Sequence, residues 1–197
     1  MPFASHSDPN FLGTLPSREF GDVVRGNAGL VALTVGIVAP DVSSEDEEDR
    51  EGTEEGIKVV GGEAARGFMA SLVEGGEGLV MLDATAFEFG KEEVVKILEK
   101  CAKLKVGSFS AGLESGWKEL FESIGEKLGG LEELEIVGVP GEAMVEKLKE
   151  GSEAGLDTGL LEKLSGKSED LKSVKVSILR TKGEHWLKEN GTWRKQG

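Results

Sequence analysis

The feature that most constrains the fold of this chain is a short apolar pattern that recurs along it. Apolar residues stand at the first, fourth and sixth positions of five segments, each of which lies next to a helix-like stretch. The segments are LVALTV at 30–35, LVMLDA at 79–84, CAKLKV at 101–106, LEELEI at 131–136 and LKSVKV at 171–176. They start 49, 22, 30 and 40 residues apart. Because alternate side chains share one face of a strand, each segment is predicted to be a strand with a buried apolar side.

Amphipathic stretches between these segments predict helices. Apolar residues recur at helical spacing from Val94 to Cys101, and again from Trp117 to Leu128. Shorter stretches of the same kind begin near residues 62, 141 and 158, and each ends close to a glycine. Strands that alternate with helices favour a parallel sheet joined by right-handed crossovers. We therefore expect one α/β domain over residues 1–197.

The repeated Leu/Cys-x-x-Leu/Val-x-Val/Ile/Ala units resemble those of leucine-rich-repeat proteins. More narrowly, they resemble the irregular repeats of F-box-associated proteins, in which a cysteine or leucine closes each helix before the next strand. The resemblance covers most of residues 17–180. It implies a short irregular solenoid, with a parallel sheet of about five strands and helices on the other face, that binds a protein through its strands. No F-box is recognised at the N-terminus, so ubiquitin-ligase adaptor function is not implied.

The net charge of −14 is spread unevenly along the chain. Residues 41–56 contain nine acidic residues and one arginine, whereas residues 171–197 have a net charge of +5. Phosphates repel a net acidic surface, which argues against nucleic acid as the main partner. The acidic stretch is interpreted either as a solvated, disordered loop within the domain or as an arm for a basic protein segment. The arm would use Glu45, Asp46, Glu47, Glu48 and Asp49.

The repeat pattern also predicts which polar residues share the exposed face of the sheet. With strands about 4.8 Å apart, Asp83 is expected beside Lys105, Lys105 beside Glu135, and Glu135 beside Lys175. Lys103 is expected beside Glu133 by the same alignment. These opposite charges either satisfy one another or form a mixed-charge surface for a partner. The residues predicted to contact a partner on this face are Met81, Asp83, Lys103, Lys105, Glu133, Glu135 and Lys175.

An alternative interpretation makes the chain a small serine hydrolase. The stretch Ser-Phe-Ser-Ala-Gly at 108–112 resembles the Gly-x-Ser-x-Gly turn of α/β-hydrolases, except that Ser108 replaces the first glycine. Asp157 and His185 follow Ser110 in the chain order of a hydrolase triad. No strand is predicted before Asp157, however, and no His-Gly oxyanion-hole signature precedes Ser110. The chain is therefore expected to be non-catalytic, either a binding scaffold or a structural or regulatory subunit of a larger assembly.

The remaining features give no sign of a cofactor, a metal ion or a membrane span. The single cysteine, Cys101, cannot form an intramolecular disulfide and is interpreted as a buried apolar residue. His6 and His185 are too far apart in the chain to form a metal-ligand motif of known spacing. No apolar run approaches the roughly 18 residues of a membrane span. A cytoplasmic or nuclear location is expected, and the oligomeric state is left open.

The last residues of the chain, 181–197, are predicted to cap the final repeat. Terminal units of a solenoid need a cover for the exposed end of their core. Trp186 and Trp193 supply two large apolar side chains for this purpose. A short helix followed by a turn is the expected form of the cap.

Overall fold

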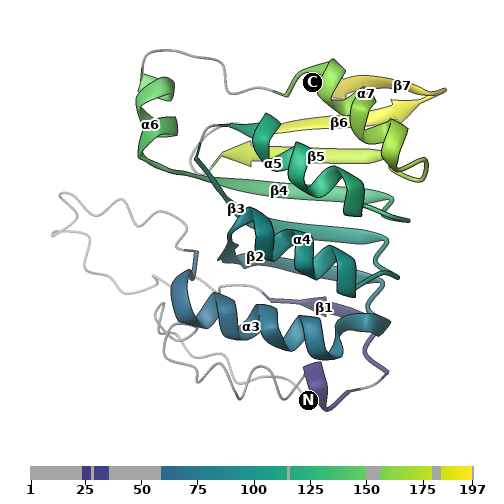
Figure 1. Ribbon diagram of the computed structural model, residues 1–197. Coiled ribbons are helices and arrows are strands. Elements are labelled where there is room, and N and C mark those ends of the chain that lie inside the picture. The colour runs from purple at the N-terminus through teal and green to yellow at the C-terminus, as the bar shows by residue number, and fades with distance from the viewer. Residues whose placement is uncertain are drawn as a thin grey trace, which may run out of the picture.

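The computed structural model describes residues 24–27, 29–35, 59–114, 116–149, 156–178 and 183–196. Within them, seven strands form one sheet in sequential order (Figure 1). The strands are β1 (Ala32–Thr34), β2 (Met81–Phe89), β3 (Val106–Leu113), β4 (Glu133–Pro140), β5 (Ser173–Ile178), β6 (Glu184–Glu189) and β7 (Thr192–Gln196). The helices are α3 (Gly62–Gly75), α4 (Lys91–Lys100), α5 (Trp117–Ile124), α6 (Glu142–Lys149) and α7 (Thr158–Lys167).

Strands β1 to β5 are parallel, which confirms the predicted α/β fold, but the sheet is mixed and has seven strands, because β6 and β7 add antiparallel pairs to the five predicted strands. Helices α3, α4, α5 and α7 lie in a row over one face of the sheet, each against the next (Figure 1). Sequential strand order joined by crossovers of one hand places these helices on the same side. Helix α6 contacts β4 and lies beyond its carboxyl end.

The hydrophobic core fills the space between the sheet and this helix row. Strand residues such as Leu82, Phe109 and Ile136 are fully buried, and they meet Val94 and Ile97 of α4 in the same cluster. The capping box at the start of α4 shows why that helix begins where it does. The backbone N–H of Gly90 donates to Glu93 Oε2 at 2.8 Å, which satisfies a donor that the helix leaves unpaired.

Four of the five predicted strands lie where the apolar pattern placed them, but the third prediction is wrong. Strand β3 begins at Val106, so Gly107 pairs with Leu82 of β2 and with Leu134 of β4. The buried positions of the third unit are therefore Gly107 and Phe109. A Cβ on Gly107 would lie 2.9 Å from Phe109 Cε2, so the phenylalanine ring occupies the space next to this position, where Leu82, Leu134 and Val174 stand in the neighbouring strands.

The C-terminal segment forms a hairpin and not the expected helix. Strand β6 pairs antiparallel with β5, and β7 pairs antiparallel with β6. Asn190 and Gly191 connect the two strands with φ angles of 51° and 82°. Asn-Gly is a preferred sequence for a two-residue hairpin turn, because both positions require a positive φ. Trp186 and Trp193 are both buried in this hairpin and belong to the hydrophobic core.

The other face of the sheet is covered by no helix in the described part of the chain, and we call it the open face. Its side chains alternate with the buried ones along each strand. The middle of the open face consists of two rows of register neighbours. The rows are Ala32, Met81, Val106, Glu133 and Ser173, followed by Thr34, Asp83, Ser108, Glu135 and Lys175.

Candidate functional site

Three carboxylates gather in the centre of the open face. Asp83 on β2 and Glu135 on β4 flank Ser108 on β3, and Glu133 lies in the adjacent row. The Ser108 hydroxyl donates to Glu135 Oε2 at 3.4 Å. Asp83 Oδ1 accepts hydrogen bonds from the backbone N–H and the hydroxyl of Thr85, at 3.2 and 2.8 Å. These bonds orient two of the carboxylates without neutralising their charge.

Several charged side chains of the helix layer form ion pairs, whereas four charged residues of the open face form none with another described residue. On the helix layer, Lys91 pairs with Glu119, Lys127 with Glu99 at 2.7 Å, and Lys167 with Glu126 at 3.1 Å. None of the charged residues Asp83, Glu133, Glu135 and Lys175 forms an ion pair with another described residue. Glu135 and Lys175 are register neighbours, as predicted, yet they make no ion pair.

The predicted alternation of charges across β3 is wrong. Lys103 and Lys105 precede β3 and do not lie on the open face, because the strand begins at Val106. Lys105 Nζ donates to the Gly130 carbonyl at 2.9 Å and pairs with Glu132 at 3.4 Å. Lys105 is therefore neighbour to neither Asp83 nor Glu135, and Lys103 does not lie beside Glu133. With no lysine on β3, the middle of the open face is acidic.

Apolar side chains border this acidic centre. Val106 is the register neighbour of Glu133, Met81 lies on the other side of Val106, and Ala32 lies beyond Met81. The side chain of Met81 is 38% exposed and that of Val31 is 55% exposed, and these are the large apolar side chains that stand out from the described surface. The open face therefore offers a protein partner both carboxylates and apolar contact area.

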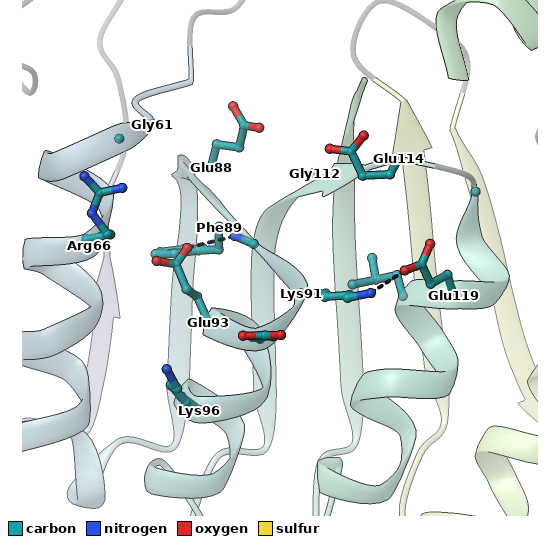
Figure 2. A pocket seen from close by; sticks show the side chains of 15 residues that line it. Gly61, Arg66, Glu88, Phe89, Lys91, Glu93, Lys96, Gly112, Glu114 and Glu119 are labelled. Atoms are coloured by element: carbon teal, nitrogen blue, oxygen red, sulfur yellow. Dashed lines mark hydrogen bonds and ion pairs between the residues drawn. The ribbon is translucent and has the colours of Figure 1, made fainter. Parts of the chain in front are cut away.

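A cleft lies at the carboxyl ends of β2 and β3. Its volume is about 630 Å³, and it extends to the N-termini of α3, α4 and α5 (Figure 2). Glu88 and Glu114 lie at the strand ends, whereas Arg66 and Lys96 project from α3 and α4 (Figure 2). The ion pair between Lys91 and Glu119 crosses between α4 and α5. Ligands of open α/β sheets commonly bind at the carboxyl ends of the strands.

A bulge in β2 places Glu88 at this edge. The register between β2 and β3 shifts between Ala84 and Glu88, and Glu88 then pairs with Ser110 on the open-face side. Burial raises the pKa of the Glu88 carboxyl, and the nearby Glu114 carboxylate raises that pKa further. Gly112 of β3 lies next to the Glu88 carboxylate, since a Cβ at this glycine would be in ordinary contact with Glu88 Oε1 at 3.6 Å.

The structure does not bring together the three residues of the hydrolase interpretation. Ser110 lies within β3, fully buried, and its hydroxyl donates to the Thr85 carbonyl at 2.6 Å. Asp157 caps α7 by accepting from the Leu160 N–H at 2.7 Å. His185 lies on β6, which is three strand spacings or roughly 14 Å from β3. Its Nε2 is 3.0 Å from Ser173 Oγ and is not paired with Ser110, so the predicted triad of Ser110, Asp157 and His185 is not assembled.

His185 borders a second, wide cleft at the β4–β7 end of the open face. The cleft has a volume of about 670 Å³ and includes Glu135 and Lys175 in its lining.

In the described residues, no group of three or more His, Cys, Asp or Glu side chains is arranged to hold a metal ion. None of the helices in the described ranges is long and apolar enough to cross a membrane. Glu45, Asp46, Glu47, Glu48 and Asp49 lie outside the described residues.

The sequence interpretation missed Glu88 and Glu114 as candidate site residues. Neither belongs to a motif, and their proximity depends on the bulge in β2 and on the register of β3. Ser108 was assigned to the hydrolase turn and is instead the open-face neighbour of Asp83 and Glu135.

Comparison with protein-family models, with curated protein sequences and with solved structures finds no match for this chain.

Proposed function

We propose that this protein is a non-catalytic scaffold whose open face binds a basic segment of a partner protein. One observation supports this most directly: Asp83, Glu133 and Glu135 lie together on a sheet face that no described helix covers, with no ion-pair partner among the described residues. Lysine or arginine side chains would supply the missing positive charge. Such complementarity accelerates encounter and selects the partner.

The arrangement of the repeats supports a leucine-rich-repeat-like scaffold of irregular type. Once β3 is aligned by its true register, Leu79, Leu104 and Leu131 are equivalent residues that stand 25 and 27 residues apart. Repeats of roughly 20–29 residues are usual for leucine-rich-repeat proteins. The parallel strands follow one another in chain order with the helices on one side, which leaves the strand face for binding.

The apolar border indicates that the partner segment also contains apolar side chains. Val106 lies directly beside Glu133 and Met81 is the next residue in the same row, within reach of the residues that flank a bound lysine or arginine. Interfaces combine such apolar contacts with a polar surround, and methionine is enriched in them. The proposed partner segment is therefore basic with interspersed apolar residues.

Neutralising the three carboxylates tests the proposal. The variant Asp83→Asn/Glu133→Gln/Glu135→Gln removes three negative charges from the open face. The variant Glu122→Gln/Glu162→Gln/Glu169→Gln makes the same change in net charge at exposed positions outside the open face, in α5, α7 and the turn before β5. Affinity capture from a lysate at low and at high salt compares both variants with the intact chain.

The intact chain and the control variant should retain the same basic proteins at low salt, and the open-face variant should lose them. Capture should weaken at high salt, because salt screens exposed charges. If the open-face variant keeps the same partners at both salt concentrations, the binding site lies elsewhere. A chain that lacks residues 44–55 tests the acidic stretch separately, and loss of the partners only in that chain would assign binding to the stretch instead.

A further inference from the structure

The open face carries opposite charges on its two halves. The strand pairing extends both of its rows from β4 across β5 and the C-terminal hairpin. One row continues with Ser173, Leu187 and Arg194, and the other continues with Lys175, His185 and Gln196. In these rows the carboxylates stand on β2 and β4, whereas the cations Lys175 and Arg194 stand on β5 and β7.

Glu135 and Lys175 lie where the two halves meet, and they do not pair with each other. They are register neighbours on β4 and β5, but neither forms an ion pair with any described residue. Arg194 has a partner in Glu189 at 3.5 Å, and its side chain remains 67% exposed. Opposite charges on neighbouring strands stabilise each other when they pair within the sheet. The unpaired charges of Glu135 and Lys175 are therefore available to charges from outside the chain.

A face with this pattern is complementary to itself. A twofold axis parallel to the strands, between β4 and β5, places β4 of one copy opposite β5 of the other, β3 opposite β6 and β2 opposite β7. Glu135 of each copy then faces Lys175 of the other copy, and Val106 faces Leu187. An axis across the strands would place each strand opposite itself, with acid against acid. The distribution of charge thus selects the first arrangement.

We propose that a second copy of this chain packs against the open face, sheet against sheet, in a symmetric dimer. Two sheets in such contact lie about 10 Å apart, and the side chains of both fill the space between them. The half-buried Val106 and Leu187 supply apolar contact, and two Glu135–Lys175 pairs near the axis fix the alignment. The dimer goes beyond the proposed function, because the second copy and a basic segment compete for the same carboxylates.

The net charge of each copy predicts that the dimer is weak. At −14 per chain the two copies repel each other as a whole. At physiological salt, charges more than about 8 Å apart are largely screened, whereas charges that face each other in the contact are closer. Dilute protein should therefore be monomeric and concentrated protein dimeric. Sedimentation velocity from about 5 to about 500 µM, a range that brackets weak association, measures the equilibrium.

Reversing the charge of either half tests the alignment. Glu133→Lys/Glu135→Lys makes both halves of the face basic, and Lys175→Glu/Arg194→Glu makes both halves acidic. Each variant alone places like charges opposite each other, so its dimer dissociation constant should rise by at least about tenfold. An equimolar mixture of the two variants restores opposite charges at both contacts. The mixture should therefore associate as readily as the intact chain, which sedimentation of one fluorescently labelled variant detects.

Matched controls carry the same changes in charge outside the open face. Glu122→Lys/Glu162→Lys and Lys118→Glu/Lys163→Glu alter exposed positions in α5 and α7. Each control alone should dimerise within about threefold of the intact chain, because only the screened overall repulsion changes. A mixture of the two controls should gain nothing over the intact chain. Circular dichroism of each variant checks that the fold is retained.

The outcomes separate the dimer from the proposed function, because no partner protein is present. An intact chain that stays monomeric over the whole range would overturn the dimer and leave a basic partner for the open face. A dimer that survives both charge reversals would lie on another surface. If the intact chain dimerises and the mixture of reversed variants does not, the twofold alignment is wrong.

Discussion

Glu88 and Glu114 are a pair of carboxylates whose negative charges disfavour the folded state. Two carboxylates share the edge of a cleft, with no cation between them among the described residues. Burial and the charge of Glu114 both raise the pKa of Glu88, which means that folding disfavours its ionised form. Residues that bind a ligand often cost stability in this way.

Replacing Glu88 by glutamine should therefore stabilise the protein at neutral pH. The variant Glu88→Gln keeps the size of the side chain and removes the unfavourable charge. We expect the free energy of unfolding at pH 7 to rise by roughly a few tenths of a kcal/mol, a small value because solvent still screens this partly buried group. Urea denaturation of the variant and of the intact chain measures the difference.

The pH dependence of this gain has a definite sign. The folded pKa of Glu88 lies above its ordinary value of 4.5, so the folded state binds more protons than the unfolded state between these two pKa values. The destabilisation by Glu88 therefore disappears as the pH falls through that window. Glu88→Gln should be more stable than the intact chain at pH 7 and equally stable near pH 3.5. A gain that persists at low pH would have a cause other than charge, and Glu122→Gln should show no gain at either pH.

At the scale of single elements, glycines in the strands decide how closely the helices pack. Gly107 of β3 leaves room for the ring of Phe109. Gly138 of β4 packs against Leu113 of β3 and Trp117 of α5. A Cβ at Gly138 would come within 2.2 Å of Leu113 Cδ1 and 3.0 Å of Trp117. Glycine weakens a strand, so its presence here indicates that close packing of neighbouring side chains outweighs this cost.

The variant Gly138→Ala should destabilise the protein by about 1–3 kcal/mol, the usual cost of overpacking a core. Leu113 and Trp117 would have to move or leave their preferred rotamers to admit the methyl group. Gly166→Ala in α7 is the matched control, because no atom lies within 4 Å of its added Cβ. This control should stabilise the helix by up to about 1 kcal/mol. Thermal unfolding followed by circular dichroism compares the two, and similar effects of both would contradict the packing argument.

At the scale of the whole molecule, the β6–β7 hairpin closes one end of the sheet. It pairs with β5, and Trp186 and Trp193 complete the core there. The Trp193 Nε1–H donates to Ser165 Oγ of α7 at 2.7 Å, which ties the hairpin to the helix layer. Without the hairpin, β5 would present unpaired backbone groups at an edge. The hairpin thus completes the hydrophobic core and prevents the edge of β5 from pairing with another chain.

Truncation after Arg180 should therefore lower the stability by at least about 3 kcal/mol, the lower end of the cost of removing one large aromatic side chain from a core. The shortened chain should also associate with increasing concentration, because the edge of β5 is exposed. Differential scanning calorimetry and sedimentation velocity measure the two effects. Trp193→Phe is the conservative comparison and should cost about 1 kcal/mol through the lost hydrogen bond. A truncated chain that remains monomeric with an unchanged Tm would show that the hairpin is dispensable.

Much of the fold follows from local patterns in the sequence. The helices α3 to α7 and the strands β1, β2, β4 and β5 lie where apolar spacing predicted them, because burial of one side imposes a period on each element. The hairpin could also have been predicted from the sequence, since Asn190-Gly191 is a preferred sequence for a two-residue hairpin turn. It was missed because the two tryptophans were interpreted as part of a helix.

The position of β3 and the charge of the open face depended on contacts between distant segments. The third unit has a glycine at a buried position, so the apolar pattern predicted Val106 as a buried residue instead. Only the pairing of Gly107 with Leu82 and Leu134 shows that Gly107 is the buried residue. In the observed register Ser108, and not Lys105, lies between Asp83 and Glu135. The sequence by itself determined the elements and their order, because these depend on local periodicity. The tertiary structure alone decided which charges meet, because neighbours across a sheet are set by register and bulges.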